Sequence, residues 1–198
     1  MIYGELLDGR TSCHSVLILG SGRSSGLTEL VDVGSPSRTP LLVISFSPQV
    51  SSDIDYWQDF LGFRPPDLTV ITTDSATGTP NTEDTVSHVS APSDMTGIGM
   101  QATEQLASWD DESGLRPLVV VDSLTILLQY VSVKSLYRFL HALTVRLDAS
   151  GARGLFFLDP QTQDDKTVYT FASLFDAIAE RDEETGAEES SEWSIRSR

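Results

Sequence analysis

Cysteine and long apolar runs are almost absent from the sequence. Cys13 is the only cysteine, which excludes an intramolecular disulfide and a cysteine-based zinc cluster. No apolar run approaches the ~20 residues that a membrane-spanning helix needs. The first residues, Met1 to Arg10, include acids and lack the apolar core of a secretory signal. We therefore expect a cytoplasmic protein with no membrane span.

Basic residues are also scarce. The 198-residue chain has 29 acidic and 13 basic residues, a formal net charge of −16, and only two of the basic residues are lysines. Nucleic acid would be repelled by so negative a protein, so we expect no nucleic-acid partner. Many acids and few lysines are typical of proteins from salt-loving archaea, whose carboxylate-rich surfaces stay hydrated when salt screens their repulsion. An ordinary acidic protein has the same composition, so both interpretations stay open.

Five short apolar runs predict the strands of the fold. They are mostly continuous rather than alternating, which is typical of strands buried on both faces of a parallel sheet. We therefore predict one α/β domain over residues 1–180, with a three-layer, doubly wound, mainly parallel sheet of about five strands. The predicted strands are Val16–Leu19, Leu41–Phe46, Leu68–Thr72, Leu118–Val121 and Gly154–Leu158, and the predicted helices are Asp53–Leu61, Asp94–Trp109, Lys134–Asp148 and Thr167–Glu180.

Two polar stretches interrupt this pattern. Residues 73–93 are rich in Thr, Ser, Pro, Asp and Asn, which predicts a long mobile loop. Residues 181–198 begin with six acids between Arg181 and Glu192, which predicts an acidic C-terminal tail. Trp193 and Ile195 stand out in that tail, either as a small strand or as a docking peptide.

The loop after the first predicted strand fits two kinds of enzyme site in part. Gly20-x-Gly22-x-x-Ser25 approximates a dinucleotide-binding turn, but the second strand ends without an acid to hold the ribose. Gly22-Arg23-Ser24-Ser25-Gly26 matches the strand-to-helix elbow that carries the nucleophile of serine hydrolases. No histidine follows the last predicted strand, so the hydrolase order is incomplete.

The same loop also approximates a phosphate-binding P-loop, G-x-x-x-x-G-K-[ST]. Ser21 stands in place of the first glycine, Leu27 replaces the lysine, and Gly26 and Thr28 match. The backbone N–H groups of such a loop surround phosphates, and the hydroxyl binds Mg²⁺. In this interpretation the nucleotide-binding residues are Ser21, Gly22, Arg23, Ser24, Ser25, Gly26 and Thr28.

Downstream segments make the P-loop interpretation more specific. Leu118-Val119-Val120-Val121-Asp122 is an apolar strand that ends in an aspartate, like a Walker B strand whose Asp holds Mg²⁺. The chain resembles a haloarchaeal subgroup of the RecA/KaiC-like superfamily over most of residues 1–180. This resemblance implies a P-loop NTPase fold, with Thr28 and Asp122 at a metal and ATP with Mg²⁺ as ligand. The resembling segments are Ser93–Gly99, Ser123–Val131, Tyr137–Thr144 and Asp159–Val168.

Two departures from the superfamily pattern bear on activity. Leu27 cannot neutralise phosphate charge, and Ser47 and Pro48 stand where a water-activating glutamate follows the second strand. We therefore expect no catalytic residue and no cofactor. The sequence predicts a non-catalytic regulatory or signalling protein that acts through a protein partner or a homo-oligomer. The alternative is an ATP-binding switch or slow ATPase in which Arg23 replaces the lysine charge.

Two further groups of charged residues have a structural and a functional interpretation. Asp159, Asp164 and Asp165 follow the fifth predicted strand, where they either bind a cation or cap the next helix. Arg138 and Arg146 lie eight residues apart, close to one face of a predicted helix. They either meet acids of a neighbouring subunit or face solvent.

Overall fold

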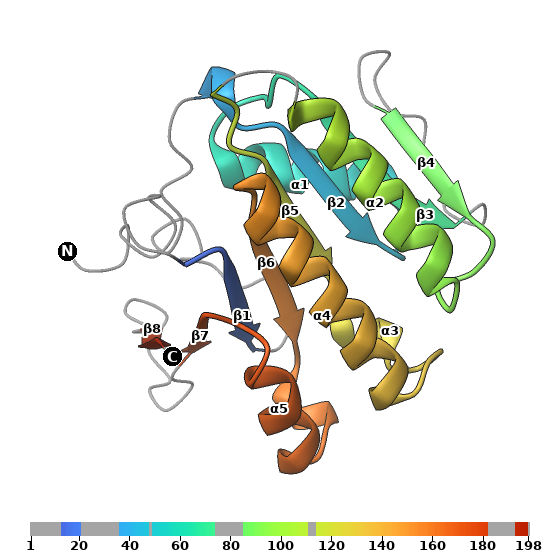
Figure 1. Cartoon of the computed structure of the whole chain (residues 1–198), viewed down its shortest axis with the longest axis vertical. Coiled ribbons are helices and arrows are strands. Elements are labelled where there is room, and N and C mark those ends of the chain that lie inside the picture. Colours follow the sequence, from blue (N-terminus) through green and yellow to red (C-terminus); the bar gives the residue numbers. More distant parts are fainter. Residues whose placement is uncertain are drawn as a thin grey trace.

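A mainly parallel β-sheet forms the centre of this computed structural model, which describes residues 13–20, 36–47, 49–73, 85–110, 114–181 and 193–197. The strands are β1 (Ser15–Leu19), β2 (Leu41–Ser45), β3 (Leu68–Thr73), β4 (Thr85–Val89), β5 (Leu118–Asp122), β6 (Arg153–Leu158), β7 (Ala177–Arg181) and β8 (Trp193–Ser197). Within these residues they form one eight-stranded sheet in the order β4-β3-β2-β5-β6-β1-β7-β8 (Figure 1). Neighbouring strands pair in parallel, except that β8 runs antiparallel to β7.

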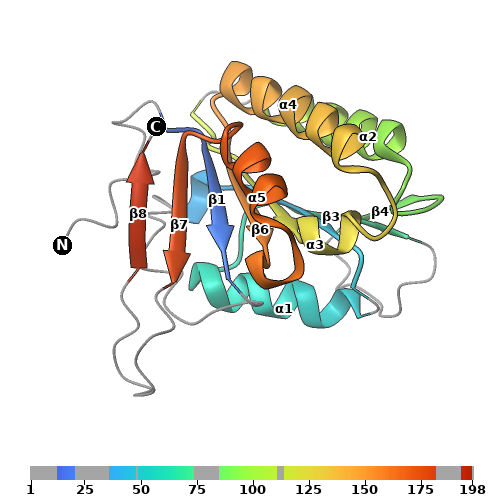
Figure 2. The same ribbon diagram turned by 90° about the horizontal axis from the view of Figure 1, so that it is seen from below.

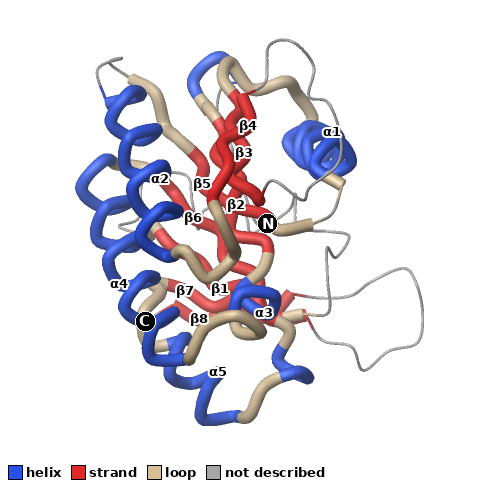
Figure 3. Tube along the Cα trace, turned by 90° about the vertical axis from the view of Figure 1, so that its right-hand side faces the viewer, coloured by secondary structure: helices blue, strands red, loops and turns tan. Residues whose placement is uncertain are grey.

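Helices cover both faces of the sheet (Figures 2 and 3). One face packs against α1 (Val50–Leu61), and the other carries α2, α3, α4 and α5. The bounds of these four helices are Met95–Asp110, Leu124–Leu127, Val133–Ser150 and Asp165–Ala172, and short 3₁₀ turns form η3 (Pro36–Arg38) and η4 (Pro160–Thr162). No described helix is both long and apolar enough to cross a membrane.

Alternation along the buried strands divides the core into two halves. In β1, Leu17 and Leu19 pack on the side of α2 and α4, whereas Val16 and Ile18 pack on the side of α1. Trp57 of α1 is fully buried in the second half, with its ring 5.6 Å from that of Phe157. The predicted α/β class with a mostly parallel sheet is therefore confirmed.

The prediction of about five strands is too low. The five predicted apolar runs are all strands, namely β1, β2, β3, β5 and β6. β1, β2 and β6 are buried along their whole length, as the continuous apolar runs predicted. β4 and β7 lie outside the predicted strands, β8 matches one of two alternatives for Trp193 and Ile195, and these three strands lie toward the two ends of the sheet.

The predicted helix over Thr167–Glu180 is wrong in its second half. α5 ends at Ala172, and β7 pairs in parallel with β1 from Ala177 onward. One carboxylate fixes this change of direction. Asp176 Oδ2 accepts hydrogen bonds from the N–H of His14, from the N–H of Ser15 and from Ser15 Oγ, each at 2.9 Å. This contact sets the start of β7 against the start of β1 and overrides the helical spacing of the apolar residues.

Both polar stretches contain a strand. β4 lies inside the predicted loop of residues 73–93 and pairs with β3, so the loop prediction is wrong there. Only Val89 of its five residues is fully buried, and an edge strand of this kind lacks a continuous apolar run. In the predicted tail, β8 confirms the small strand around Trp193 and Ile195, because both side chains pack on the α1 half of the core. Residues 90–93, between β4 and α2, form no helix or strand, and residues 74–84, 182–192 and 198 lie outside the described ranges.

Aspartate side chains cap the N-termini of two of the predicted helices. Asp94 Oδ1 accepts from the N–H of Gly97 at 2.8 Å at the start of α2, and Asp164 Oδ1 accepts from the N–H of Thr167 at 2.6 Å at the start of α5. Gly151 ends α4 in the left-handed conformation, with φ of 64°. The predicted helices that became α1, α2 and α4 therefore begin and end within a few residues of their predicted bounds.

Replacing Asp176 with alanine should destabilise the fold. The change removes the acceptor from the N–H and hydroxyl of Ser15, which is only 3% exposed. Because hydrogen bonds to charged acceptors contribute ~1.5–3 kcal/mol each and their losses overlap, we expect the free energy of unfolding to fall by about 2–4 kcal/mol. Denaturant titration in molar KCl measures this change.

The matched control is Asp148→Ala, whose 75% exposed side chain lies 3.6 Å from His14 Nε2. It should lose less than ~1 kcal/mol, and equal losses in both variants would contradict the role of Asp176.

The N-terminal cap of α5 should make this helix sensitive to acid. The hydrogen bond from the N–H of Thr167 holds the pKa of Asp164 below its ordinary value. A group with a lowered pKa stabilises the fold above its unfolded pKa and loses that contribution as the pH falls through its folded pKa. We expect the protection factors of the α5 amides, relative to intrinsic exchange at the same pH, to fall below pH ~4, near the ordinary aspartate pKa. Asp164→Asn keeps an acceptor without the titration, so an identical acid profile in that variant would refute the assignment.

Candidate functional site

Four strands end side by side at the edge of the sheet where the predicted site residues lie. In the order β2-β5-β6-β1, Ser45 is in register with Asp122, and Leu19 with Leu158. Parallel strands bring their carboxyl ends to one edge, where α/β proteins bind ligands. Gly20 donates its N–H to Leu158 O at 3.1 Å and is the last described residue before the predicted phosphate-binding loop. That loop therefore starts at the same edge as Asp122, with β6 between them.

The predicted nucleotide-binding residues lie outside the described ranges. They are Ser21, Gly22, Arg23, Ser24, Ser25, Gly26 and Thr28. Of the predicted metal pair, Asp122 is described. It ends β5, is half-buried, makes a contact within the chain, and precedes a cis peptide bond to Ser123. The described residues contain no group of three or more His, Cys, Asp or Glu side chains that could hold a metal ion.

Hydroxyl groups at this edge are engaged by the protein itself. Ser45 Oγ donates to Asp53 Oδ2 at 2.8 Å and accepts from the N–H of Ser47 at 3.3 Å. Thr125 Oγ1 accepts from the N–H of Asp159 at 2.9 Å, which ties the end of β6 to α3. Ser47 stands where the resemblance places a glutamate, and its backbone is held by the end of β2. These hydroxyls position loops, as in a scaffold.

Asp53 is a candidate that the sequence analysis counted only as the first residue of a helix. Its side chain belongs to the first turn of α1, is 2% exposed, and accepts the bond from Ser45 at the end of β2. A carboxylate this deeply buried is costly unless it is hydrogen-bonded. Its position shortly after a strand was the only available signal, and helical periodicity treats such an acid as facing solvent.

The three aspartates after β6 divide into caps and an exposed side chain. Asp159 Oδ1 accepts from the N–H of Gln161 at 2.9 Å and begins η4, and Asp164 begins α5. Asp165 follows in the first turn of α5 and is exposed. Capping of the predicted helix is therefore confirmed for Asp164, whereas Asp159 caps the 3₁₀ turn before it.

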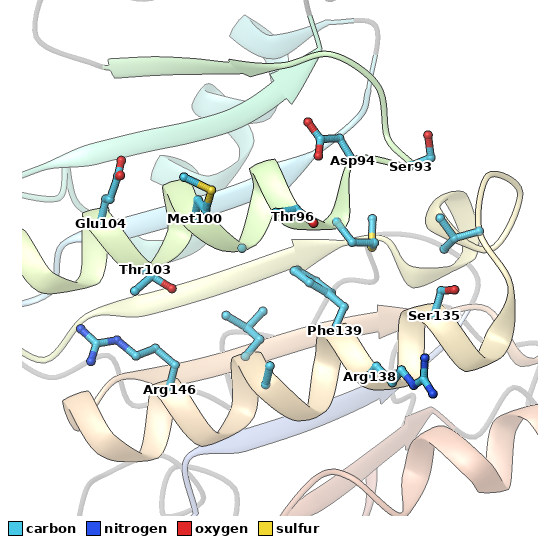
Figure 4. A pocket seen from close by; sticks show the side chains of 15 residues that line it. Ser93, Asp94, Thr96, Met100, Thr103, Glu104, Ser135, Arg138, Phe139 and Arg146 are labelled. Atoms are coloured by element: carbon cyan, nitrogen blue, oxygen red, sulfur yellow. The ribbon is translucent and has the colours of Figure 1, made fainter.

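A groove of about 850 Å³ lies between α2 and α4 on their outer side (Figure 4). Phe139 projects between the two helices, and Met100, 58% exposed, stands above it on α2. Arg138 and Arg146 both line this groove, as expected for residues on one face of a helix. Arg146 also forms an ion pair, 3.3 Å long, with Asp110 at the end of α2. Periodicity showed that the arginines share a face, but it could not show that α2 would lie beside it.

A second hollow, of about 490 Å³, brings together residues that are scattered in sequence. His14, His141, Asp148 and Asp176 contribute to its lining. His14 is held by two contacts, with Nδ1 at 3.3 Å from Ala152 O and Nε2 at 3.6 Å from Asp148 Oδ1. Asp176 is engaged at the starts of β1 and β7, so its role here is structural.

Cys13 lies just before β1 and is a poor nucleophile. Burial raises the pKa of its thiol to about 11, and the negative charge of Asp176 adds to this effect. The thiolate is the reactive form of cysteine, so little of it is present at neutral pH. Cys13 packs against the α1 half of the core.

Solved structures share this architecture. An uncharacterised protein of Pyrococcus horikoshii, PH0321, described in complex with an unknown peptide, is 13% identical with a TM-score of 0.60, over 93% of this chain and 83% of that one. PH0250 of Pyrococcus horikoshii OT3 is 12% identical with a TM-score of 0.54, over 86% of this chain and 82% of that one. At this identity the likeness shows the fold alone. No curated protein matches the sequence.

One family model matches the sequence across nearly the whole sheet. The match runs over residues 14–181, from the start of β1 to the end of β7, and leaves out only β8 among the described strands. The family is described as a family of unknown function. Because the match covers far more than half of the 198 residues, the chain belongs to this family, DUF7504.

Proposed function

We propose that this protein is a non-catalytic member of the RecA/KaiC-like class that regulates or signals through contacts with other proteins. The observation that carries this proposal is the groove between α2 and α4, about 850 Å³ in volume. Phe139 projects into it, an exposed Met100 lies at its rim, and Arg138 and Arg146 flank it. Exposed apolar side chains bordered by charged ones are typical of protein-binding surfaces.

The strand order supports placement in the RecA/KaiC-like class. The P-loop-like segment follows β1 and the Walker B-like segment is β5, and a single strand, β6, separates them. Strands lie about 4.8 Å apart, so the ends of β1 and β5 are roughly 10 Å from each other. A phosphate chain and a metal ion fit between a loop and a carboxylate at this separation. This separation of the two strand ends supports the proposed RecA/KaiC-like class.

The chemistry of the same edge supports a loss of catalysis. The loop has Leu27 in place of a lysine, and Ser47 replaces the expected glutamate. The backbone N–H of Ser47 donates to Ser45, and Thr125 holds the end of β6. These contacts maintain the loops without supplying a base or a positive charge for phosphoryl transfer.

The likeness to PH0321 also favours a binding role. That protein is described in complex with an unknown peptide, and it aligns with 93% of this chain. A fold of this kind can therefore hold a polypeptide segment. For the present chain, the α2/α4 groove is the described surface that combines an apolar floor with charged flanks.

A nucleotide titration tests this proposal. We expect calorimetry with ATP and Mg²⁺ to show no saturable heat, and no phosphate release, from folded protein in ~2–3 M KCl, which screens the acidic surface. Both results follow from the missing lysine and glutamate. Folding is checked by circular dichroism in the same buffer. Heat that saturates at one site per chain would refute the proposal that the carboxyl edge of the sheet has only a structural role.

The second candidate is an ATP-binding switch or slow ATPase, which the buried Asp53 favours. Asp53 places a carboxylate at the end of β2, 2% exposed, near the position of the missing glutamate. If ATP binds, the heat should disappear in Thr28→Ala and Asp122→Ala and persist in the matched controls Thr170→Ala and Asp148→Ala. Slow hydrolysis that is lost in Asp53→Asn, with binding retained, would assign the base.

A further inference from the structure

The outward face of α2 and α4 carries a pattern that is complementary to itself. We propose that a second copy of this chain docks on this face, with its α2 over the α4 of the first copy and its α4 over the α2. The two copies are related by a two-fold axis that runs parallel to the helices. This inference rests on the proposed function, because it names one partner for the protein contacts.

Charge on this face is separated by helix. The described part of α2 has no basic residue, and its acids, including the capping residue, are Asp94, Glu104 and Asp110. α4 has a single acid, Asp148, and its basic residues are Lys134, Arg138 and Arg146. A two-fold axis along the groove lays the acidic helix of each copy on the basic helix of the other. Opposite charges then meet in both halves of the interface.

The levels of these charges along the helices also agree. α2 and α4 run in the same direction, because each returns from the carboxyl edge of the parallel sheet (Figure 1). The ring of Phe139 reaches the same height along the helix axes as Gly99, since a Cβ on Gly99 would be 3.7 Å from the ring. Glu104 lies five residues beyond Gly99, and Arg146 seven beyond Phe139. At a rise of 1.5 Å per residue their levels differ by about 3 Å. Rotation about a parallel axis preserves these levels, so Glu104 of one copy comes opposite Arg146 of the other.

The arginines of this face have hydrogen-bonding capacity to spare. Arg146 Nη2 reaches Asp110 Oδ2 at 3.3 Å, but the side chain remains 32% exposed and the guanidinium has further N–H donors. Arg138 is exposed and has no hydrogen bond or ion pair with any described residue. A carboxylate from a second copy would satisfy such a guanidinium with short, charge-assisted bonds. A desolvated ion pair of this kind is also screened less by salt than one at an open surface.

Apolar side chains complete the face. Met100 on α2 is 58% exposed, and exposed Ala142 of α4 lines the same groove, whereas exposed Val145 lines the second hollow. α2 has 16 residues and is therefore ~24 Å long. Two adjacent helices are about 20 Å wide, so the face of each copy that is buried in the dimer has an area of roughly 500 Å². The total of about 1,000 Å² is at the lower limit for a specific interface. We therefore expect a dimer that dissociates in the micromolar range.

Sedimentation velocity on the full chain tests this proposal with two single substitutions. Arg146→Glu places like charges opposite Glu104 at both symmetric contacts, and Glu104→Arg does the same opposite Arg146. In ~2 M KCl, at concentrations from ~1 to 100 µM, we expect the unsubstituted chain to shift from monomer to dimer. Each variant alone should need at least tenfold higher concentration. An equal mixture of the two should dimerise again, because both contacts then pair opposite charges.

Two control substitutions separate this face from general charge effects. Arg196→Glu removes an exposed arginine that also pairs with one acid, Glu180, but lies on β8. Asp59→Arg reverses a charge on α1, on the opposite face of the sheet. Both variants should dimerise as the unsubstituted chain does. A monomer at every concentration, a dimer indifferent to both α2/α4 substitutions, or a mixture that stays monomeric would overturn the proposal. The calorimetric experiment decides the proposed function separately.

Discussion

Burial of a parallel sheet on both faces is the constraint on which the rest of this structure depends. Parallel strands need crossover connections, and their helices must cover both sides of the sheet. β1, β2 and β6 are buried from end to end, so polar groups have no place along them. Those groups collect instead where the strands end, and the carboxyl edge therefore becomes both the candidate site and the region that most needs internal hydrogen bonds.

Hydrogen bonding at the ends of strands determines what the polar side chains can do. Ser45 is bound to the buried Asp53, and Thr125 holds the end of β6. At the other edge, Asp176 uses one oxygen to fix the starts of β1 and β7. A carboxylate or hydroxyl committed in this way is a costly participant in chemistry, because moving it exposes unsatisfied N–H and O–H groups. The hydrogen bonds at these strand ends therefore favour a structural role for Ser45 and Thr125.

The sequence was most informative where burial alone determines structure. The continuous apolar runs located five strands, and periodicity located α1, α2 and α4. It failed where a long-range contact decides: the spacing around Phe171 and Ile178 is helical, but the bonds from His14 and Ser15 to Asp176 turn the chain into β7. β4 was not predicted because a partly exposed edge strand needs no apolar run. The groove was not predicted because it forms between two helices, and only the topology of the sheet makes these helices neighbours.

The net charge of the chain does not reveal the local charge pattern of the α2/α4 face, in which an acidic helix lies beside a basic one. A formal charge of −16 makes most surfaces of two copies repel one another, so random encounters through those surfaces are disfavoured. α4 departs from this composition, with three basic residues against one acid, and α2 opposes it with acids alone. Arginine suits such a position, because its guanidinium is weakly hydrated and binds carboxylates with two bonds. In the proposed dimer, repulsion between the other surfaces and attraction across the α2/α4 face would both favour this face as the contact.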